Sequence, residues 1–229
     1  MPRRKDRTNP NQLLVEGKDD EFLIPYLMDN FVVWGDREED WPVQIESFDG
    51  VKNLLKPAII RAELKRPGLK ALGIIVDADD QRDARWATVA GHCRGTVSDF
   101  PDHLPAEGLI HQSASGLRVG VWIMPDNQSV GMLETFLREM VPADQAPLWA
   151  FAQRARAEAK SHGATYSEVH RDKADIHTHL AWLDPPGQQL HTAMYRKALD
   201  ARTPLGLRFA RWFVGLFGLA ARDAAGLAG

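Results

Sequence analysis

The sequence predicts an α/β protein whose mostly parallel sheet is flanked by helices. Short apolar runs typical of strands alternate with helix-like segments as far as Pro142. One run, at residues 71–76, is apolar throughout, as in a strand that is buried on both faces of a parallel sheet. After Pro142 the strand-like runs disappear, and we expect a helical region to follow the sheet.

The first half of the predicted sheet begins with the apolar run at residues 13–17. Residues 19–31 predict a helix, because apolar side chains recur there at helical spacing: Phe22, Leu23, Tyr26 and Leu27. Alternating residues at 43–47 predict a second strand. A turn then leads into a helix at residues 51–65, which we expect Pro67 and Gly68 to end.

The second half of the sheet starts with the buried strand at residues 71–76 and a helix at residues 80–93. Two more strands are expected at residues 108–111 and 117–124, joined by a polar Ser-Ala-Ser-Gly turn. A helix at residues 131–140 closes this part of the chain. We therefore expect an α/β domain over residues 8–142 and a helical region, packed on it, over residues 143–221.

Four further helices are expected in the helical region, at residues 147–161, 173–183, 190–201 and 205–219. Pro and Gly residues separate the last three. The segment 205–219 is strongly apolar but too short and too charged to span a bilayer, so we interpret it as a core helix or a homodimer helix. The tryptophans of this region, Trp149, Trp182 and Trp212, are also expected in the core.

The composition restricts the classes of protein that this chain can represent. Its 229 residues carry a net charge of -3, which gives no global basic signature for nucleic acid but leaves room for a local basic patch. The single cysteine, Cys93, cannot form an internal disulfide. A reducing, cytoplasmic location is the default expectation, with no membrane partner.

Acidic residues follow three of the predicted strands. Glu16 ends the first strand, Asp77 and Asp79 follow the third, and Asp126 follows the last. The carboxyl ends of parallel strands meet at one edge of a sheet, where open α/β sheets bind ligands. Side chains two apart in an extended segment point the same way, so Asp77 and Asp79 are expected to reach one point. Asp20 lies one helical turn beyond Glu16 on the same face.

Carboxylates gathered in this way repel one another unless a cation neutralises them. Their hard oxygen atoms suit Mg²⁺ or Mn²⁺. We therefore expect a metal site formed by acidic side chains: Glu16, Asp20, Asp77, Asp79 and Asp126. For Asp126 and the adjacent Asn127, a simple Asx turn is an equally good interpretation. Glu134 is explained by the preference of a helix start for carboxylates, although it can also face the site.

Basic and polar side chains near these acids are candidates for substrate contacts. Lys18 directly follows the Glu16-Gly17 turn, where it can meet a phosphate or remain a solvated surface residue. Lys173 and His177 share one face of a predicted helix. We expect these three residues, together with Asn127, to contact substrate.

The segments VEGKDD, at residues 15–20, and VDADD, at residues 76–80, resemble the pattern of the Toprim domain, which occurs in topoisomerases, primases and nucleases. WIMPDN, at residues 122–127, and KADIHTHLAW, at residues 173–182, resemble an uncharacterised prokaryotic Toprim-related family. The resemblance implies a Toprim-like fold over residues 8–142. It also implies Mg²⁺ at Asp77 and Asp79 and a general acid or base at Glu16, so these three residues are the expected catalytic group.

Two classes of function fit these features. The first is a Mg²⁺-dependent enzyme that acts on phosphodiester bonds of DNA or RNA. The second is a non-catalytic regulatory or scaffold protein that binds a metal or nucleotide through the same fold. A topoisomerase is disfavoured because no tyrosine nucleophile stands out, and a complete primase is disfavoured because a zinc module is absent.

Overall fold

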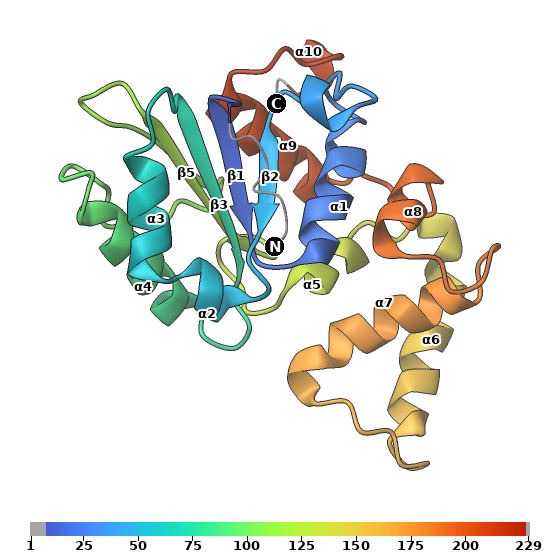
Figure 1. Ribbon diagram of the computed structural model, residues 1–229. Coiled ribbons are helices and arrows are strands. Elements are labelled where there is room, and N and C mark those ends of the chain that lie inside the picture. Colours follow the sequence, from blue (N-terminus) through green and yellow to red (C-terminus); the bar gives the residue numbers. More distant parts are fainter. Residues whose placement is uncertain (1–7, 228–229) are drawn as a thin grey trace, which may run out of the picture.

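The computed structural model describes residues 8–227 and contains one five-stranded sheet (Figure 1). The strand order is β2-β1-β3-β5-β4. Every neighbouring pair is parallel except β4 and β5. The strands are β1 (Asn11–Val15), β2 (Gln44–Ser47), β3 (Ala71–Asp77), β4 (Leu109–Gln112) and β5 (Arg118–Met124). The predicted α/β class is confirmed, and all five strands lie close to their expected positions.

Helices connect and cover the strands: α1 (Lys18–Met28), α2 (Val51–Leu54), α3 (Pro57–Leu64), α4 (Arg82–Arg94), α5 (Leu133–Arg138), α6 (Ala146–Ala159), α7 (Arg171–Ala181), α8 (Leu190–Tyr195), α9 (Pro204–Phe217) and α10 (Ala224–Leu227). Short 3₁₀ turns are η1 (Glu38–Asp40), η2 (Ala143–Gln145) and η3 (Glu168–His170).

The prediction of a single helix at residues 51–65 is wrong, because the structure has two helices there. Pro57 begins α3 rather than continuing α2. Proline has no backbone N–H and clashes with the preceding turn inside a helix, whereas the first helical position tolerates it.

Two apolar layers cover the two faces of the sheet. On one face, α3 and α4 pack over side chains such as Leu72, Ile74 and Val121. On the other face, α1 and α9 pack over Leu13, Ile75 and Trp122 (Figure 1). Burial of large apolar side chains on both faces leaves the carboxyl edge of the sheet as the place where polar groups can gather.

Helix α9 lies directly on the sheet because two strand glycines let it approach. A Cβ atom at Gly120 of β5 would lie 2.4 Å from Leu216 Cδ2, and one at Gly73 of β3 would lie 3.0 Å from Phe217 Cζ. Phe209, Phe213 and Leu216 of this helix are fully buried within the chain. Of the two interpretations of this segment, the core helix therefore describes its packing.

The rest of the helical region extends to one side of the sheet (Figure 1). Helices α6 and α7 pack on each other, α7 packs on α5, and α8 packs on α1. Trp212 and Trp149 lie in or against the core, as expected. Trp182 does not, because it is 42% exposed and stacks on Phe151.

In the part of the chain that the structure describes, no helix is long and apolar enough to cross a membrane.

Candidate acidic site

Glu16 and Asp77 meet at the carboxyl edge of the sheet because β1 and β3 are parallel neighbours. Leu14 pairs with Ile74, so the residues that follow these strands emerge together. The backbone N–H of Asp77 donates a 2.8 Å hydrogen bond to Glu16 Oε1. The carboxylate of Asp77 accepts a 3.0 Å bond at Oδ1 from the backbone N–H of Leu133, at the start of α5. The two predicted acids are therefore brought together, as the sequence indicates.

Asp20 joins them from the first turn of α1. Its Oδ2 accepts a 3.0 Å hydrogen bond from the backbone N–H of Gly17, which caps the helix. A carboxylate is favoured at this end of a helix by the unpaired N–H groups and the helix dipole. Asp20 is nevertheless only 7% exposed, so much of its interaction with water is lost.

Glu134 and Lys173 complete the site from the other side. Glu134 lies in the first turn of α5 and is 3% exposed. The Nζ atom of Lys173, in α7, lies 2.7 Å from Glu134 Oε1 and 3.8 Å from Asp19 Oδ2. The helical region thus places a cation over an otherwise acidic site.

A cavity of about 240 Å³ lies among these side chains. Its lining comes from the ends of β1 and β3 and the starts of α1, α5 and α7: Glu16, Gly17, Lys18, Asp19, Asp20, Gly50, Asp77, Leu133, Glu134 and Lys173. We call this the acidic cavity. Its position matches the place where open α/β sheets bind ligands.

Burial and mutual repulsion shift the pKa values of these acids upward. Burial is the main cause for Glu16. Its pKa rises to about 7, although the hydrogen bond from the backbone N–H of Asp77 and the positive charge of Arg85 oppose the shift. Burial, with the charges of Glu16 and Glu134, raises the pKa of Asp20 to about 7. The pKa of Asp77 is raised well above its usual range by burial and by the neighbouring acids. These groups are thus close enough to influence one another's ionisation.

Within residues 8–227, the structure contains no group of three or more His, Cys, Asp or Glu side chains that could hold a metal ion. A cation in the acidic cavity would therefore be held by fewer protein ligands and by water. Mg²⁺ usually binds in this way, through one or two carboxylates and several retained waters. The hard oxygen donors of Asp20 and Asp77 fit such an ion.

Asp79 does not lie beside Asp77 in the way that the sequence suggests. Strand β3 ends at Asp77, and Asp79 has a φ of 49°, so the two side chains no longer follow the alternation of an extended segment. The carboxylate of Asp79 instead pairs with Arg85, with Oδ2 2.9 Å from Nη2. Arg85 also donates a 2.9 Å bond to the carbonyl oxygen of Asp77. Asp79 therefore borders the acidic cavity without lining it.

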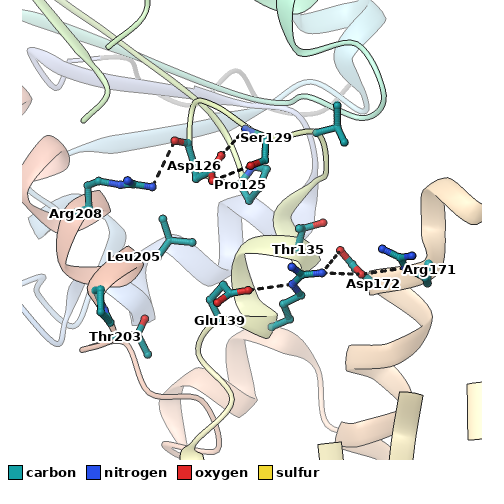
Figure 2. A pocket seen from close by; sticks show the side chains of 13 residues that line it. Pro125, Asp126, Ser129, Thr135, Glu139, Arg171, Asp172, Thr203, Leu205 and Arg208 are labelled. Atoms are coloured by element: carbon teal, nitrogen blue, oxygen red, sulfur yellow. Dashed lines mark hydrogen bonds and ion pairs between the residues drawn. The ribbon is translucent and has the colours of Figure 1, made fainter. Parts of the chain in front are cut away.

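Asp126 lies in a different cavity, of about 600 Å³, between the loop after β5 and helices α5, α7 and α9 (Figure 2). Its carboxylate accepts hydrogen bonds from the backbone N–H groups of Gln128 and Ser129 and from the Ser129 hydroxyl. These bonds lower the pKa of Asp126 although burial opposes ionisation. Of the two interpretations, the Asx turn describes this geometry, because Asp126 does not join the other acids.

Asn127 is fully buried and has a structural role. Its Oδ1 accepts a 2.8 Å bond from the backbone N–H of Ile123, and its Nδ2 donates a 3.1 Å bond to the carbonyl oxygen of Ala106. Because its side chain is fully buried and both amide atoms bind the backbone, Asn127 is not exposed for the substrate contact that the sequence suggests.

The three basic candidates occupy different positions. Lys18 lines the acidic cavity, with its Nζ 2.6 Å from Glu21 Oε2 and its side chain 59% exposed. Lys173 lies inside the site, and His177, one turn further along α7, is exposed and outside the cavity. The predicted substrate face of α7 is thus reduced to Lys173 at the cavity itself.

Glu134 lines the acidic cavity and Arg85 pairs with the adjacent Asp79, although neither was an expected ligand. Glu134 has a signal in the sequence, since its helix starts at the same edge of the sheet, but the helix dipole explained it equally well. Arg85 has no comparable signal, because an arginine in a solvated helix after a strand is common. Its contact with Asp79 depends on the backbone turn at Asp79.

A protein-family model matches residues 10–218 of this chain and is described as a protein of unknown function, DUF3226. The chain belongs to the DUF3226 family. The family's description names no Toprim domain. No curated protein and no solved structure matches the chain. Family membership therefore shows what the chain is related to and does not indicate its function.

Proposed function

We propose that this DUF3226 protein has a Toprim-like core at residues 8–142 and is a divalent-cation-dependent enzyme that acts on phosphodiester bonds of DNA or RNA. The observation that carries the proposal is the meeting of Glu16, Asp20, Asp77 and Glu134 in one cavity. Buried carboxylates that repel one another are costly to a fold unless a cation binds them, and clusters of this kind are typical of functional sites.

The side chains of the acidic cavity differ in what they can do. Asp77 uses Oδ1 to accept a backbone hydrogen bond, which leaves Oδ2 as the atom that can bind Mg²⁺ or Mn²⁺ together with Asp20. A bound cation would stabilise charge on phosphoryl oxygens and lower the pKa of a water molecule. Glu16, with a pKa of about 7, can accept or release a proton near neutral pH and suits the role of general acid or base.

The remaining candidates have smaller parts in this proposal. Lys173 can move its ammonium group from Glu134 to a substrate phosphate, and Lys18 can contact phosphate at the cavity rim. His177 is a more distant phosphate contact on the same helix. Asp79 can bind the cation only if its ion pair with Arg85 opens.

A second function is favoured by one observation, the ion pair between Lys173 and Glu134. The ammonium group already offsets part of the negative charge in the cavity, so the fold does not depend on a divalent cation for that purpose. A non-catalytic regulatory or scaffold protein that binds a metal or nucleotide fits this arrangement. Such a protein would bind ligand at the acidic cavity without turnover.

The experiment that tests the proposal combines metal binding with cleavage. Mg²⁺ and Mn²⁺ are titrated calorimetrically into the wild type, Asp77→Asn and Asp83→Asn. The same samples are then incubated with single- and double-stranded DNA and RNA. Asp83 is a matched control, because it is a carboxylate of the neighbouring helix α4 that is 92% exposed and does not line the cavity.

We expect Asp77→Asn to lose metal binding and cleavage, and Asp83→Asn to retain both. Asp77→Asn also removes a repelled charge, so its melting temperature without metal should rise at pH 8. This rise separates loss of a ligand from loss of the fold. Metal binding by the wild type without cleavage would favour the non-catalytic function. If the wild type binds no metal at millimolar concentration, the metal-dependent enzyme and the metal-binding regulatory protein are both contradicted.

A further inference from the structure

Helix α1 carries aromatic residues on its solvent-exposed face. Lys18, Phe22 and Tyr26 are spaced by four residues and are all exposed, whereas Leu23 and Leu27 are buried against the sheet. Phe22 is 50% exposed and Tyr26 is 41% exposed. The outer face of such an amphipathic helix is normally polar. The packing of α1 on the sheet therefore does not account for two half-exposed aromatic side chains one turn apart on its outer face.

Helix α8 continues this aromatic surface. The ring of His191 stacks on Tyr26 with centroids 5.7 Å apart and lies 5.8 Å from Phe22. The ring of Tyr195 lies 5.7 Å from Tyr26 and is 70% exposed. We call these four residues, Phe22, Tyr26, His191 and Tyr195, the aromatic strip. It is formed where α1 and α8 pack side by side (Figure 1).

The aromatic strip runs from the acidic cavity toward free cations. Lys18 lines the cavity and lies one turn before Phe22 on the same helix. At the other end, Arg196 and Lys197 directly follow Tyr195 and are exposed. Neither of these two cations forms an ion pair within the described residues. The rise of an α-helix puts Lys18 and Tyr26 about 12 Å apart, a distance that several nucleotides can span.

We propose that the aromatic strip binds single-stranded nucleic acid and leads it to the acidic cavity. Every base has a π face, so exposed aromatic rings bind bases without regard to sequence, with Lys and Arg contacting the backbone. A double helix keeps its bases stacked on one another and cannot use such a surface. This inference rests on the proposed phosphodiester activity and narrows its substrate to single strands.

Binding is measured by fluorescence anisotropy with labelled 12-nucleotide DNA and RNA strands and with the corresponding duplexes. The full chain is used in EDTA, so that no metal-dependent turnover occurs. We expect single strands to bind the wild type more tightly than duplexes. Phe22→Ala and Tyr26→Ala should each weaken single-strand binding about tenfold, as expected for the loss of one base stack.

Matched variants distinguish stacking from a general loss of surface. Phe22→Trp should retain binding, and Phe22→Leu should weaken it about as much as Phe22→Ala, because leucine keeps the bulk without the π face. Phe151→Ala is the control, because Phe151 is also 50% exposed and stacked on another ring, but belongs to α6, away from the strip. It should bind as the wild type does. Arg196→Ala with Lys197→Ala should reduce the dependence of binding on salt.

Three results would overturn the inference. The first is equal binding of duplexes and single strands. The second is unchanged binding by Phe22→Ala and Tyr26→Ala. The third is a wild type that binds no oligonucleotide but self-associates in sedimentation, with the self-association abolished by Phe22→Ala and Tyr26→Ala. In that case a second copy of the chain would occupy the aromatic strip. Single-strand binding that depends on the aromatic strip, without any cleavage, would support this inference and contradict the proposed phosphodiester activity. Cleavage that the variants of the aromatic strip leave unchanged would support that activity and contradict this inference.

Discussion

Lys173 Nζ lies 2.7 Å from Glu134 Oε1, which joins the helical region to the edge of the sheet. Burial lowers the pKa of Lys173, but the bond and charge of Glu134 outweigh it, so the pKa of Lys173 is raised and its ammonium group stays protonated. Glu134 is almost fully buried, whereas Lys173 is 44% exposed at its side chain. The ammonium group therefore stabilises a carboxylate that has little contact with water, while the lysine side chain itself is open to solvent.

Lys173→Met tests this relationship. Removing the ammonium group leaves the Glu134 carboxylate buried without its partner, and we expect the free energy of unfolding at pH 8 to fall by about 1–2 kcal/mol, a value reduced for the exposure of Lys173. Affinity for Mn²⁺ should rise, because a competing positive charge is gone. Urea unfolding and calorimetry measure the two effects. Lys18→Met is the control, since Lys18 pairs with Glu21 at the rim, and unchanged values in Lys173→Met would contradict the argument.

The acids of the cavity predict how stability depends on pH. Glu16 and Asp20 have folded pKa values of about 7, above their usual values of 4.5 and 3.8. Between these limits the folded state holds more protons than the unfolded state, so stability falls as pH rises from about 4 to about 7. The loss should be on the order of a few kcal/mol for Asp20 alone.

Thermal unfolding from pH 4 to pH 8 without divalent cations measures this dependence. Asp20→Asn should make the fall in stability above pH 4 less steep, since Glu16 still contributes, and Asp83→Asn should leave the profile unchanged. Added Mg²⁺ should raise the melting temperature at pH 8 much more than at pH 5, because a cation binds the ionised carboxylates. A wild-type melting temperature that rises from pH 5 to pH 7 would contradict the raised pKa values of Glu16 and Asp20.

Gly120→Ala should weaken the packing of α9 on the sheet. The added Cβ would lie 2.4 Å from Leu216 Cδ2 in a fully buried layer, so the helix must shift. We expect a loss of about 1–3 kcal/mol in the free energy of unfolding, the usual cost of overpacking. Gly91→Ala in α4 is the control, since a Cβ there meets nothing within 4 Å and should stabilise the helix by about 0.5–1 kcal/mol. Equal urea midpoints for the two variants would contradict the close approach of α9.

The sheet and the meeting of Glu16, Asp20 and Asp77 could be predicted because they depend on local patterns. An apolar run marks each strand, and a parallel sheet brings strand ends to one edge whatever the loops between them do. Direct contact between Glu16 and Asp77 also requires β1 and β3 to be neighbours in the sheet, which these local patterns do not reveal. Asp20 follows from Glu16 because it lies in the first turn of the helix that comes directly after that strand, which is again a local relationship.

The positions of Asp79, Asn127 and Asp126 depend on turns whose conformation the sequence does not reveal. Asp79 and Asn127 have positive φ values, 49° and 68°, which direct their side chains away from the alternation of the strands before them. Asp126 turns back on its own loop through Ser129. The exposed aromatic strip was equally hidden, because Phe22 and Tyr26 have the helical spacing of core residues. Only the packing of α1 on the sheet, which buries Leu23 and Leu27, shows which face is exposed.

Arg156→Met tests whether α6 holds α7, and with it Lys173, in place. Arg156 of α6 and Asp175 of α7 form a two-point ion pair, with Nε 2.8 Å from Oδ1 and Nη2 3.3 Å from Oδ2, and Asp175 is 2% exposed. Breaking the pair leaves a buried charge alone, which typically costs about 3–5 kcal/mol. Hydrogen exchange should show faster exchange in α7 than in the wild type, with β3 little changed, because few contacts of α6 reach the sheet. Arg154→Met, an exposed arginine of the same helix, should leave α7 protected. If both variants protect α7 as the wild type does, the ion pair does not position Lys173, and the packing of α7 on α5 is sufficient.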